Sequence, residues 1–300
     1  MVSSRTTNPA LAPGQETLPS VSILIASRNR QQDINRCLQS ILTQPTRPRQ
    51  IIVVDQSERK YDLSPVPGLI HLHCPNLSGL TAARNAGIIC ATSDVIFFLD
   101  DDCELLADCV QILARAFIDQ PNAIAISCTL IAPQSSQAVG LHTLIDNVFE
   151  LGFFSRKPVN SKLGVRLKNA TGVAGYRRSI FEYELFDENL TGYCFGEDWE
   201  FSRRASRYGY ITRAVDARVL HHVSPTNRLD VRRGLINRWK NYLYFYDKLA
   251  DDSMWDRFCR LWWMVGQSLT WTRVGMGLPF LTSNRSLKIN GANPNSNEAN

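Results

Sequence analysis

Short apolar runs alternate with amphipathic stretches along the first hundred residues. Each run has the length of one β-strand and few polar side chains, and the runs cover Val21–Ala26, Gln50–Asp55, Ile70–His73 and Val95–Leu99. Between them, apolar positions recur every three or four residues over 34–42 and 80–91, which is the period of a helix with one buried face. Buried strands that alternate with helices predict a parallel sheet covered by helices on both faces.

The pattern beyond residue 102 is less regular. It predicts helices at 104–118 and 199–208 and strands at 123–131 and 211–223, whereas 139–170 receives no assignment. The predicted fold class is therefore α/β, with a Rossmann-like, mostly parallel central sheet flanked by helices and a helical appendage at the C-terminus.

Helices dominate the prediction for 228–275. An apolar stripe at helical spacing runs through this part and consists of Phe258, Leu261, Trp262, Val265 and Leu269. Both ends of the chain are rich in small polar residues and predict unstructured tails. We expect four segments, which are a flexible tail at 1–20, an α/β domain at 21–225, a helical extension at 226–282 and a disordered tail at 283–300.

The composition is that of an ordinary globular protein, with 44% hydrophobic and 20% charged residues among 300. A net charge of +5 does not by itself indicate a nucleic-acid partner. The eight cysteines lack the spacing of metal ligands, and a reduced, cytoplasmic protein is the default for a chain of this size. The N-terminus has no apolar run typical of a signal peptide, and no stretch of about 18 apolar residues predicts a spanning helix.

Basic and aromatic residues gather toward the C-terminus. The basic residues are Arg228, Arg232, Arg233, Arg238 and Lys240, and five of the six tryptophans occur from position 239 onward. This combination suits an anionic membrane surface and predicts peripheral attachment at the inner face of the plasma membrane. The alternative is a packed helical subdomain with a solvated basic face, and the sequence leaves both open.

Polar side chains follow three of the predicted strands. Ser27–Arg30, Asp55 and Asp100–Asp102 come directly after apolar runs, so they are expected at the carboxyl edge of the sheet, where ligands bind in such folds. Asp100 and Asp102 project the same way and can hold one hard cation. No basic residue interrupts the triplet, which predicts repulsion without a cation. The alternative is a solvated acidic turn that caps a helix.

Five segments of the sequence resemble the successive motifs of family-2 glycosyltransferases with the GT-A fold. They are Val21–Arg30, Val53–Asp55, Ala83–Gly87, Phe98–Asp102 and Gly196–Arg204, the last followed by Gly209. Their order and spacing agree over about residues 21–225, and the C-terminal third lies outside the resemblance. The resemblance implies an inverting enzyme that transfers a sugar from a nucleotide-diphosphate donor.

The resemblance also implies a nucleotide site. The residues expected there are Ser27, Arg28, Asp55, Arg84, Asn85, Asp100 and Asp101. Asp55 would accept a hydrogen bond from the base, which favours uracil or thymine, and Arg84 and Asn85 would contact the nucleotide or support its pocket. The sequence departs from the family pattern at this point. The family usually has Asp-Asp or Asp-Asn followed by Gly-Ser, whereas here Asp55 is followed by Gln56 and Ser57. This departure leaves the nucleotide preference open.

The metal implied by the resemblance is Mn²⁺ or Mg²⁺. Asp102 would bind it, and Asp100 would share it or face the ribose, while the role of Asp101 is open. A histidine of the pair His221–His222 is expected to complete the shell, and we assign His222.

The general base implied by the resemblance is Asp198, with Glu197 beside it to orient the site or bind the acceptor. The alternative is that these two acids only complement a helix dipole. Arg177 and Arg178 are expected either to meet phosphate or to cap a helix.

The acceptor implied by the resemblance is a glycan or a lipid-linked saccharide, in envelope or exopolysaccharide synthesis. One alternative is a nucleotidyltransferase, although the loop at 27–30 lacks the glycines that such an enzyme uses to hold a triphosphate. Another alternative is a catalytically inactive nucleotide-binding or membrane-docking protein. A nucleic-acid partner is not expected, because acids line the predicted crevice. The sequence makes no prediction about oligomeric state.

Overall fold

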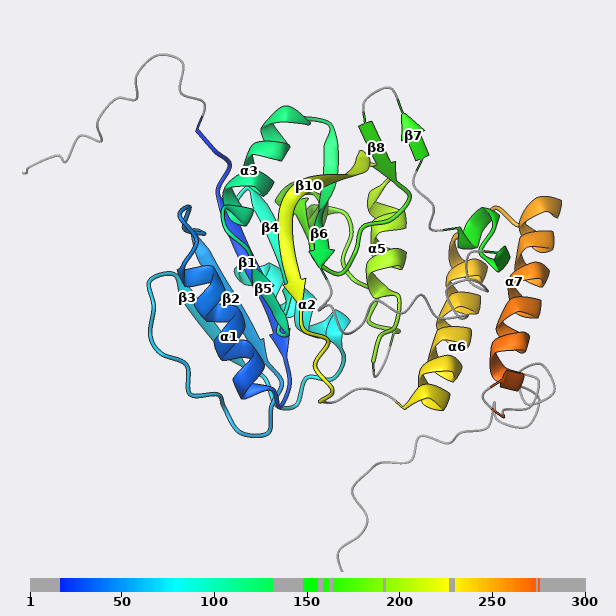
Figure 1. Ribbon diagram of the computed structural model, residues 1–300, viewed down its shortest axis with the longest axis horizontal. Helices are drawn as coiled ribbons and strands as arrows, with labels where there is room; N and C mark the ends of the chain where they lie inside the picture. The colour runs from blue at the N-terminus through cyan, green and yellow to red at the C-terminus, as the bar shows by residue number, and fades with distance from the viewer. Residues whose placement is uncertain are drawn as a thin grey trace, which may run out of the picture.

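The computed structural model describes residues 17–131, 148–155, 159–161, 164–190, 193–226, 230–273 and 275. Residues 1–16 of the expected N-terminal tail and the whole tail at 283–300 lie outside the described residues. Ten strands among the described residues form one sheet, in the order β3-β2-β1-β4-β9-β6-β10-β8-β7, with β5 paired to β10 (Figure 1). No helix in the described part of the chain combines the length and apolar character needed to cross a bilayer.

The first half of the sheet is parallel and follows the predicted pattern. Its strands are β1 (Val21–Ser27), β2 (Gln50–Asp55), β3 (Leu69–His73) and β4 (Val95–Asp100). In the parallel register, Ser27 lies opposite Asp55, and Ala26 lies opposite Asp100. The carboxyl ends of these strands therefore meet at one edge of the sheet, as predicted.

Helices cover both faces of this half, because successive side chains of each strand point to opposite faces. Ile23, Val53 and Phe97 pack under α1 (Gln31–Leu42) and α3 (Cys109–Asp119). Leu24 and Phe98 pack on the other face, with α2 (Leu80–Cys90) and α5 (Glu197–Ala205). The predicted α/β class with a mixed, mostly parallel sheet is confirmed.

The second half of the sheet is mixed in direction. Its strands are β5 (Cys103–Leu105), β6 (Ala123–Ile131), β7 (Val159–Ser161), β8 (Gly164–Leu167), β9 (Ala174–Arg177) and β10 (Tyr210–His221). β9 runs antiparallel between β4 and β6, whereas β10 is parallel to β6. The helix predicted at 104–118 begins only at Cys109, because residues 103–105 pair with the end of β10 as a strand.

Arg177, at the end of β9, caps a helix and lies away from the site. Its guanidinium donates to the carbonyl oxygens of Phe117 and Gln120, at the C-terminus of α3, and to Ala123. The short 3-10 helix η3 (Arg178–Glu182) follows directly. The capping alternative for Arg177 is therefore the one that the structure shows.

An aromatic core joins α5 to the two C-terminal helices, α6 (Val231–Leu249) and α7 (Met254–Arg273), and to the 3-10 helix η2 (Gly152–Phe154). Phe154 stacks on Trp263 at 4.8 Å between ring centroids, and Trp199 of α5 stacks on Tyr242 of α6 at 5.5 Å. Figure 1 shows α6 and α7 side by side at one end of the sheet. The helical extension therefore shares a core with the α/β domain.

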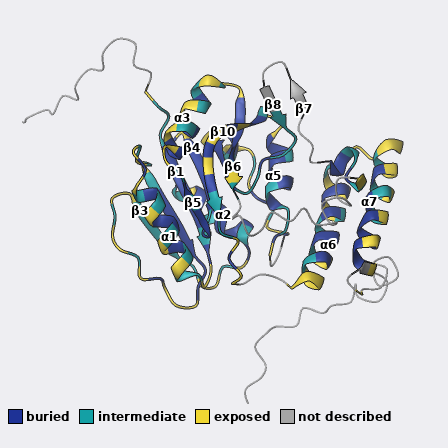
Figure 2. Ribbon diagram, viewed as in Figure 1, coloured by how far each residue is buried: buried dark blue, intermediate teal, exposed yellow. Residues whose placement is uncertain are grey.

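The apolar stripe predicted within 228–275 is present on α7 but faces away from this core. Phe258, Leu261, Val265 and Leu269 are exposed, whereas Trp263 on the opposite side of the helix is fully buried (Figure 2). The helix thus has apolar side chains on both its packed and its outward faces, and the sequence period alone does not distinguish them.

Candidate active site

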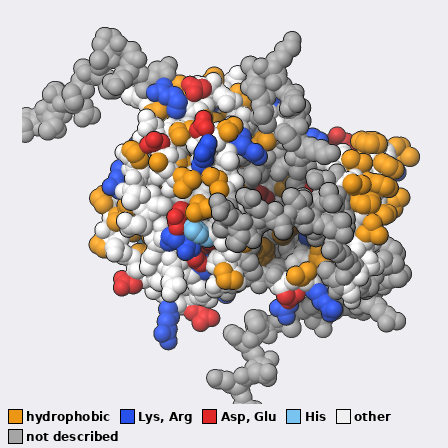
Figure 3. Space-filling view, in the orientation of Figure 1, with side chains coloured by type: hydrophobic (Ala, Val, Ile, Leu, Met, Phe, Trp, Pro, Cys, Tyr) orange, Lys and Arg blue, Asp and Glu red, His pale blue; other side chains and the backbone are white. Residues whose placement is uncertain are grey.

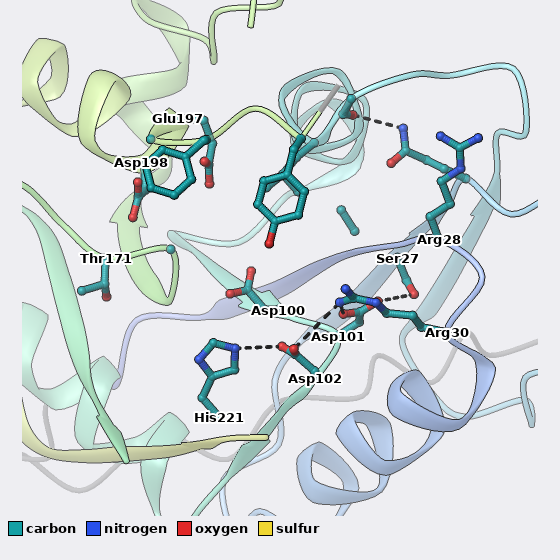
Figure 4. Close-up of a pocket in the computed structure, with 18 of the residues that line it drawn as sticks. Ser27, Arg28, Arg30, Asp100, Asp101, Asp102, Thr171, Glu197, Asp198 and His221 are labelled. Carbon is teal, nitrogen blue, oxygen red and sulfur yellow. Dashed lines mark hydrogen bonds and ion pairs between the residues drawn. The ribbon is translucent and has the colours of Figure 1, made fainter. Parts of the chain in front are cut away.

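A cavity of about 870 Å³ opens at the carboxyl edge of the sheet. Seven residues predicted at the site line it, namely Ser27, Arg28, Asp100, Asp101, Asp102, Glu197 and Asp198. Aromatic side chains from outside the predicted set complete the wall, and they are Tyr193, Phe195, Trp199 and Tyr242. Figure 4 shows the acidic triplet on one side of the cavity and Glu197 with Asp198 on the other.

Asp101, the middle acid of the triplet, is held by the loop that follows β1. The Ser27 hydroxyl donates to Asp101 Oδ2 at 2.6 Å, and Arg30 Nη1 lies 2.8 Å from Asp101 Oδ1. Burial raises the pKa of Asp101 to about 6, although the charge of Arg30 opposes this shift. Both carboxylate oxygens of Asp101 are therefore engaged in hydrogen bonds within the protein.

Arg30 supplies a positive charge to the triplet that the sequence pattern did not reveal. Its guanidinium also lies 3.9 Å from Asp102 Oδ2 and donates to the carbonyl oxygen of Thr226, which follows β10. The repulsion expected within the triplet is therefore partly offset by Arg30, which comes from a different strand end. The case for a metal must instead come from the side chains that converge in space.

Asp102 is the strongly acidic member of the triplet. His221 Nε2 lies 3.1 Å from Asp102 Oδ1, and the backbone N–H of Ser224 donates to Oδ2 at 2.9 Å. Burial opposes ionisation, but the hydrogen bond and charge of His221 lower the pKa of Asp102 to about 2. Asp102 is thus ionised across the physiological range.

His221, and not the predicted His222, lies in the cavity. His222 Nε2 lies 2.7 Å from Glu104 Oε1, on the other side of the chain. Successive side chains at the end of β10 point to opposite faces, so only one of the two neighbouring histidines can face Asp102. Of the pair, it is therefore His221, and not the expected His222, whose ring lies beside Asp102.

Four donor atoms converge around Asp102, and they belong to Asp100, Asp102, Cys103 and His221, all within 4.8 Å of one another. Burial raises the pKa of the Cys103 thiol, so this thiol stays protonated and is a poor ligand. Two carboxylates and one imidazole remain. This donor set fits Mn²⁺ or Mg²⁺, which prefer oxygen ligands, and the imidazole is better suited to Mn²⁺.

Glu197 and Asp198 form the opposite wall, at the first turn of α5. Gly196, just before the helix, adopts φ +85°, and a Cβ there would lie 2.9 Å from the ring of Phe245. Glycine therefore allows both the turn and the close packing of α5 against α6. The backbone N–H of Trp199 donates to Asp198 Oδ1 at 2.8 Å. Both acids lie where a helix N-terminus favours negative charge.

Arg84 connects the two acidic walls from beneath the cavity. Its Nη1 donates to Glu197 Oε1 at 3.0 Å, and its Nη2 lies 3.6 Å from Asp100 Oδ1. Burial, together with the charge of Asp198, nevertheless raises the pKa of Glu197 to about 8. Arg84 does not line the cavity, and its place agrees with support for the pocket.

Two other residues expected at the nucleotide lie outside the cavity. Asp55 is fully buried, and its carboxylate accepts from the backbone N–H groups of Ser57 and Tyr61, both at 2.9 Å. Asn85 donates to the carbonyl oxygen of Phe186 and accepts from the backbone N–H of the same residue. Both side chains hold loops in place in this structure, whereas Gln56, next to Asp55, lines the cavity.

Several cavity residues were missed by the sequence analysis. Thr171 and Gly172 come from the segment before β9, and Tyr242 comes from α6, far along the chain. Arg30 lies in the loop Ser27–Arg30 that the sequence analysis placed at this edge, but nothing in the pattern indicated its pairing with Asp101. The aromatic residues carried no signal, because an aromatic side chain in a helix is indistinguishable by spacing from an ordinary core residue.

The cavity with paired acids on a Rossmann-like sheet is typical of nucleotide-dependent enzymes, and a family comparison specifies the class. The model of the family "Glycosyl transferase family 2" matches residues 22–185, which is more than half of the chain. The protein therefore belongs to glycosyl transferase family 2. The matched residues include the triplet but end before Glu197, Asp198 and His221.

Solved structures with the same fold have low sequence identity to the chain. A mannosyltransferase from Pyrobaculum calidifontis in complex with GDP-Man and Mn²⁺ superposes with a TM-score of 0.57, at 15% identity over 88% of this chain and 75% of the other. GalNAc-T7 with UDP, GalNAc and Mn²⁺ superposes with a TM-score of 0.56, at 18% identity over 79% and 49%. These likenesses show the GT-A fold.

A similar protein by sequence is the glucosyl-dolichyl phosphate glucuronosyltransferase of Haloferax volcanii. It is 27% identical over 119 residues, which are 37% of this chain and 38% of the relative. The chain thus matches little more than a third of that relative's length.

Proposed function

We propose that the protein transfers a glycosyl group from a nucleoside-diphosphate sugar to an acceptor hydroxyl, with inversion at the anomeric carbon. The observation that carries the proposal is the convergence of two acidic walls on one cavity. One wall offers Asp100, Asp102 and His221 to a divalent cation, and the other presents Asp198 across the cavity. A catalytic domain at 21–225 with a helical extension at 226–282 remains part of the proposal.

The chain's own residues divide the chemistry between these walls. The oxygen of the acceptor hydroxyl bonds to the anomeric carbon as the bond from that carbon to the diphosphate breaks. Asp198 accepts the proton that the hydroxyl loses in this step. A divalent cation held by Asp100, Asp102 and His221 would neutralise the charge that develops on the leaving diphosphate. Arg84 holds Glu197 beside Asp198 and so fixes the wall that carries the base.

The donor nucleotide is proposed to be UDP or dTDP on the strength of the family resemblance. Asp55 is enclosed by its own loop, so recognition of the base through its carboxylate requires that loop to open. The proposed acceptor is a glycan or a lipid-linked saccharide. The name of the Haloferax relative, which specifies a dolichyl-phosphate-linked acceptor, supports the lipid-linked alternative.

Calorimetry tests the site directly. UDP, dTDP, GDP and CDP are titrated into the full chain with Mn²⁺ and again with EDTA. Binding of one uridine or thymidine nucleotide that requires Mn²⁺ is the expected result. Binding of GDP or CDP alone would contradict the preference for uridine or thymidine nucleotides but would still support the proposed nucleotide site. Absence of metal-dependent binding for all four would overturn the proposed function and favour the inactive docking protein.

A further inference from the structure

The outward face of α7 is largely apolar, although the exposed Arg257, which pairs with Asp252, lies among its apolar side chains. Six large side chains on it are between 43% and 80% exposed, and they are Met254, Trp255, Phe258, Leu261, Val265 and Leu269. Trp255, Phe258 and Trp262 stack along the helix, at 5.5 Å and 6.2 Å between successive ring centroids. Figure 3 shows hydrophobic side chains gathered at the edge of the molecule over α7.

This face is not the result of a loosely placed helix, because the opposite face of α7 is firmly packed. Cys259 and Trp263 are fully buried, and a Cβ added at Gly266 would lie 2.4 Å from Phe149. Trp263 also stacks on Tyr242 at 5.4 Å. The orientation of α7 is therefore fixed, and its apolar outer face is a stable property of the surface.

The size of the face argues against a second copy of the chain as its occupant. Its exposed area is on the order of 600 Å², which equals the largest patches of typical monomers but is below the roughly 800 Å² that each partner of a standard interface buries. The face is also the convex side of a single helix and offers no groove to a protein partner.

A lipid bilayer suits this face better. The helix is 20 residues long but not apolar enough to span a membrane. It can instead lie parallel to the membrane surface and bury its apolar side in the interface. Tryptophan, phenylalanine and leucine are common on the apolar face of helices that lie in the membrane interface. Near the C-terminal end of α7, Arg232 and Arg233 at the start of α6 are exposed and can meet anionic headgroups.

We infer that α7 docks the protein on the surface of a lipid bilayer, with Met254, Phe258, Leu261, Val265 and Leu269 immersed among the acyl chains. This inference does not depend on the proposed function. One consequence does rest on it. Tyr242 of α6 lines the cavity and stacks on Trp263 of α7, so docking holds the cavity close to the membrane and favours a lipid-linked acceptor.

The test is flotation of the full chain with vesicles of phosphatidylcholine and phosphatidylglycerol. The wild type should float with the vesicles, and its tryptophan emission should shift to shorter wavelength. The double variant Phe258→Glu/Leu261→Glu should lose roughly tenfold or more of its partitioning, because carboxylates resist transfer into the apolar layer. Both positions are exposed, so the substitutions leave the core intact.

Matched controls place the same charge on isolated exposed apolar residues elsewhere. Ile89→Glu on α2 and Val215→Glu on β10 should partition like the wild type. Equal partitioning of the double variant and the wild type would overturn the inference, as would a wild type that never floats. Light scattering that shows a wild-type dimer and a monomeric double variant would also overturn it, in favour of a second copy.

The calorimetric experiment separates this inference from the proposed function. The double variant should bind nucleotide with Mn²⁺ as the wild type does, since neither position lines the cavity. Loss of flotation with intact nucleotide binding supports docking by α7.

Discussion

The two acidic walls of the cavity shift the pKa values of their carboxyl groups in opposite directions. In the wall at β4, His221 lowers the pKa of Asp102 to about 2, so this carboxylate stays ionised. In the wall at α5, burial and the charge of Asp198 raise the pKa of Glu197 to about 8, so this carboxyl keeps its proton near neutrality. The first wall is suited to attract a cation, and the second is suited to hold and exchange protons.

The difference follows from the groups that surround each acid. Asp102 accepts from an imidazole and a backbone N–H, and Arg30 lies nearby. Glu197 has one cationic partner, Arg84, which it shares with Asp100. The first wall therefore keeps more carboxylates than Arg30 can neutralise, whereas at the second wall the protonated Glu197 leaves Asp198 and Arg84 to balance one another. The following predictions test whether the two walls act separately.

The largest expected effect comes from Asp198→Asn. An amide cannot accept the proton of the acceptor hydroxyl, so turnover should fall by roughly a thousandfold, within the range typical of general bases. Affinity for the nucleotide should remain, because the first wall is intact. Turnover is measured as nucleoside diphosphate released from the matching sugar nucleotide. Asp216→Asn, at an exposed position outside the cavity, is the control. Turnover within a few-fold of the wild type would remove Asp198 as the base.

A smaller effect is expected from Asp102→Asn. Replacement of one carboxylate ligand should weaken Mn²⁺-dependent nucleotide binding by roughly a hundredfold, since metal sites commonly lose this much when a ligand or its support is changed. Any residual binding that calorimetry detects in EDTA should be the same in the variant and the wild type. An equal loss with and without metal would mean that Asp102 supports the pocket and does not hold the cation.

The smallest effect concerns the stability of the second wall. A carboxyl whose folded pKa is raised from 4.5 to about 8 stabilises the folded protein below its unfolded pKa and loses that contribution as pH rises through about 8. The free energy of unfolding should therefore fall between about pH 4.5 and pH 8 by at most a few kcal/mol. Glu197→Gln should flatten this fall, as followed by thermal melting across that range. Parallel pH profiles in variant and wild type would show that Arg84 keeps Glu197 ionised.

The sheet and the position of the cavity could be predicted from the sequence because they depend on local patterns. Apolar runs placed β1 to β4, and parallel pairing then brought Ser27 and the triplet to one edge. The contacts that give each acid its character could not be predicted in the same way. Arg84 and Glu197 are 113 positions apart, and the sequence contains no signal for their pairing.

Two other differences have specific causes. The choice between His221 and His222 depends on the strand register at the end of β10, which a shift of one residue reverses. Asp55 was expected to meet the base, but the chain from Gln56 to Tyr61 folds back and donates its backbone N–H groups to that carboxylate. Such loop closure is not visible in the residue pattern.

The shared aromatic core has a consequence for exchange of parts between related enzymes. Trp199 lies one residue after Asp198 and packs against Tyr242 and Phe245 of α6, while Gly196 allows that close approach. A chimera joined near residue 225 would set a foreign helix pair against the element that carries Asp198. Recombination that preserves catalysis should therefore transfer α5, α6 and α7 together as one inherited unit.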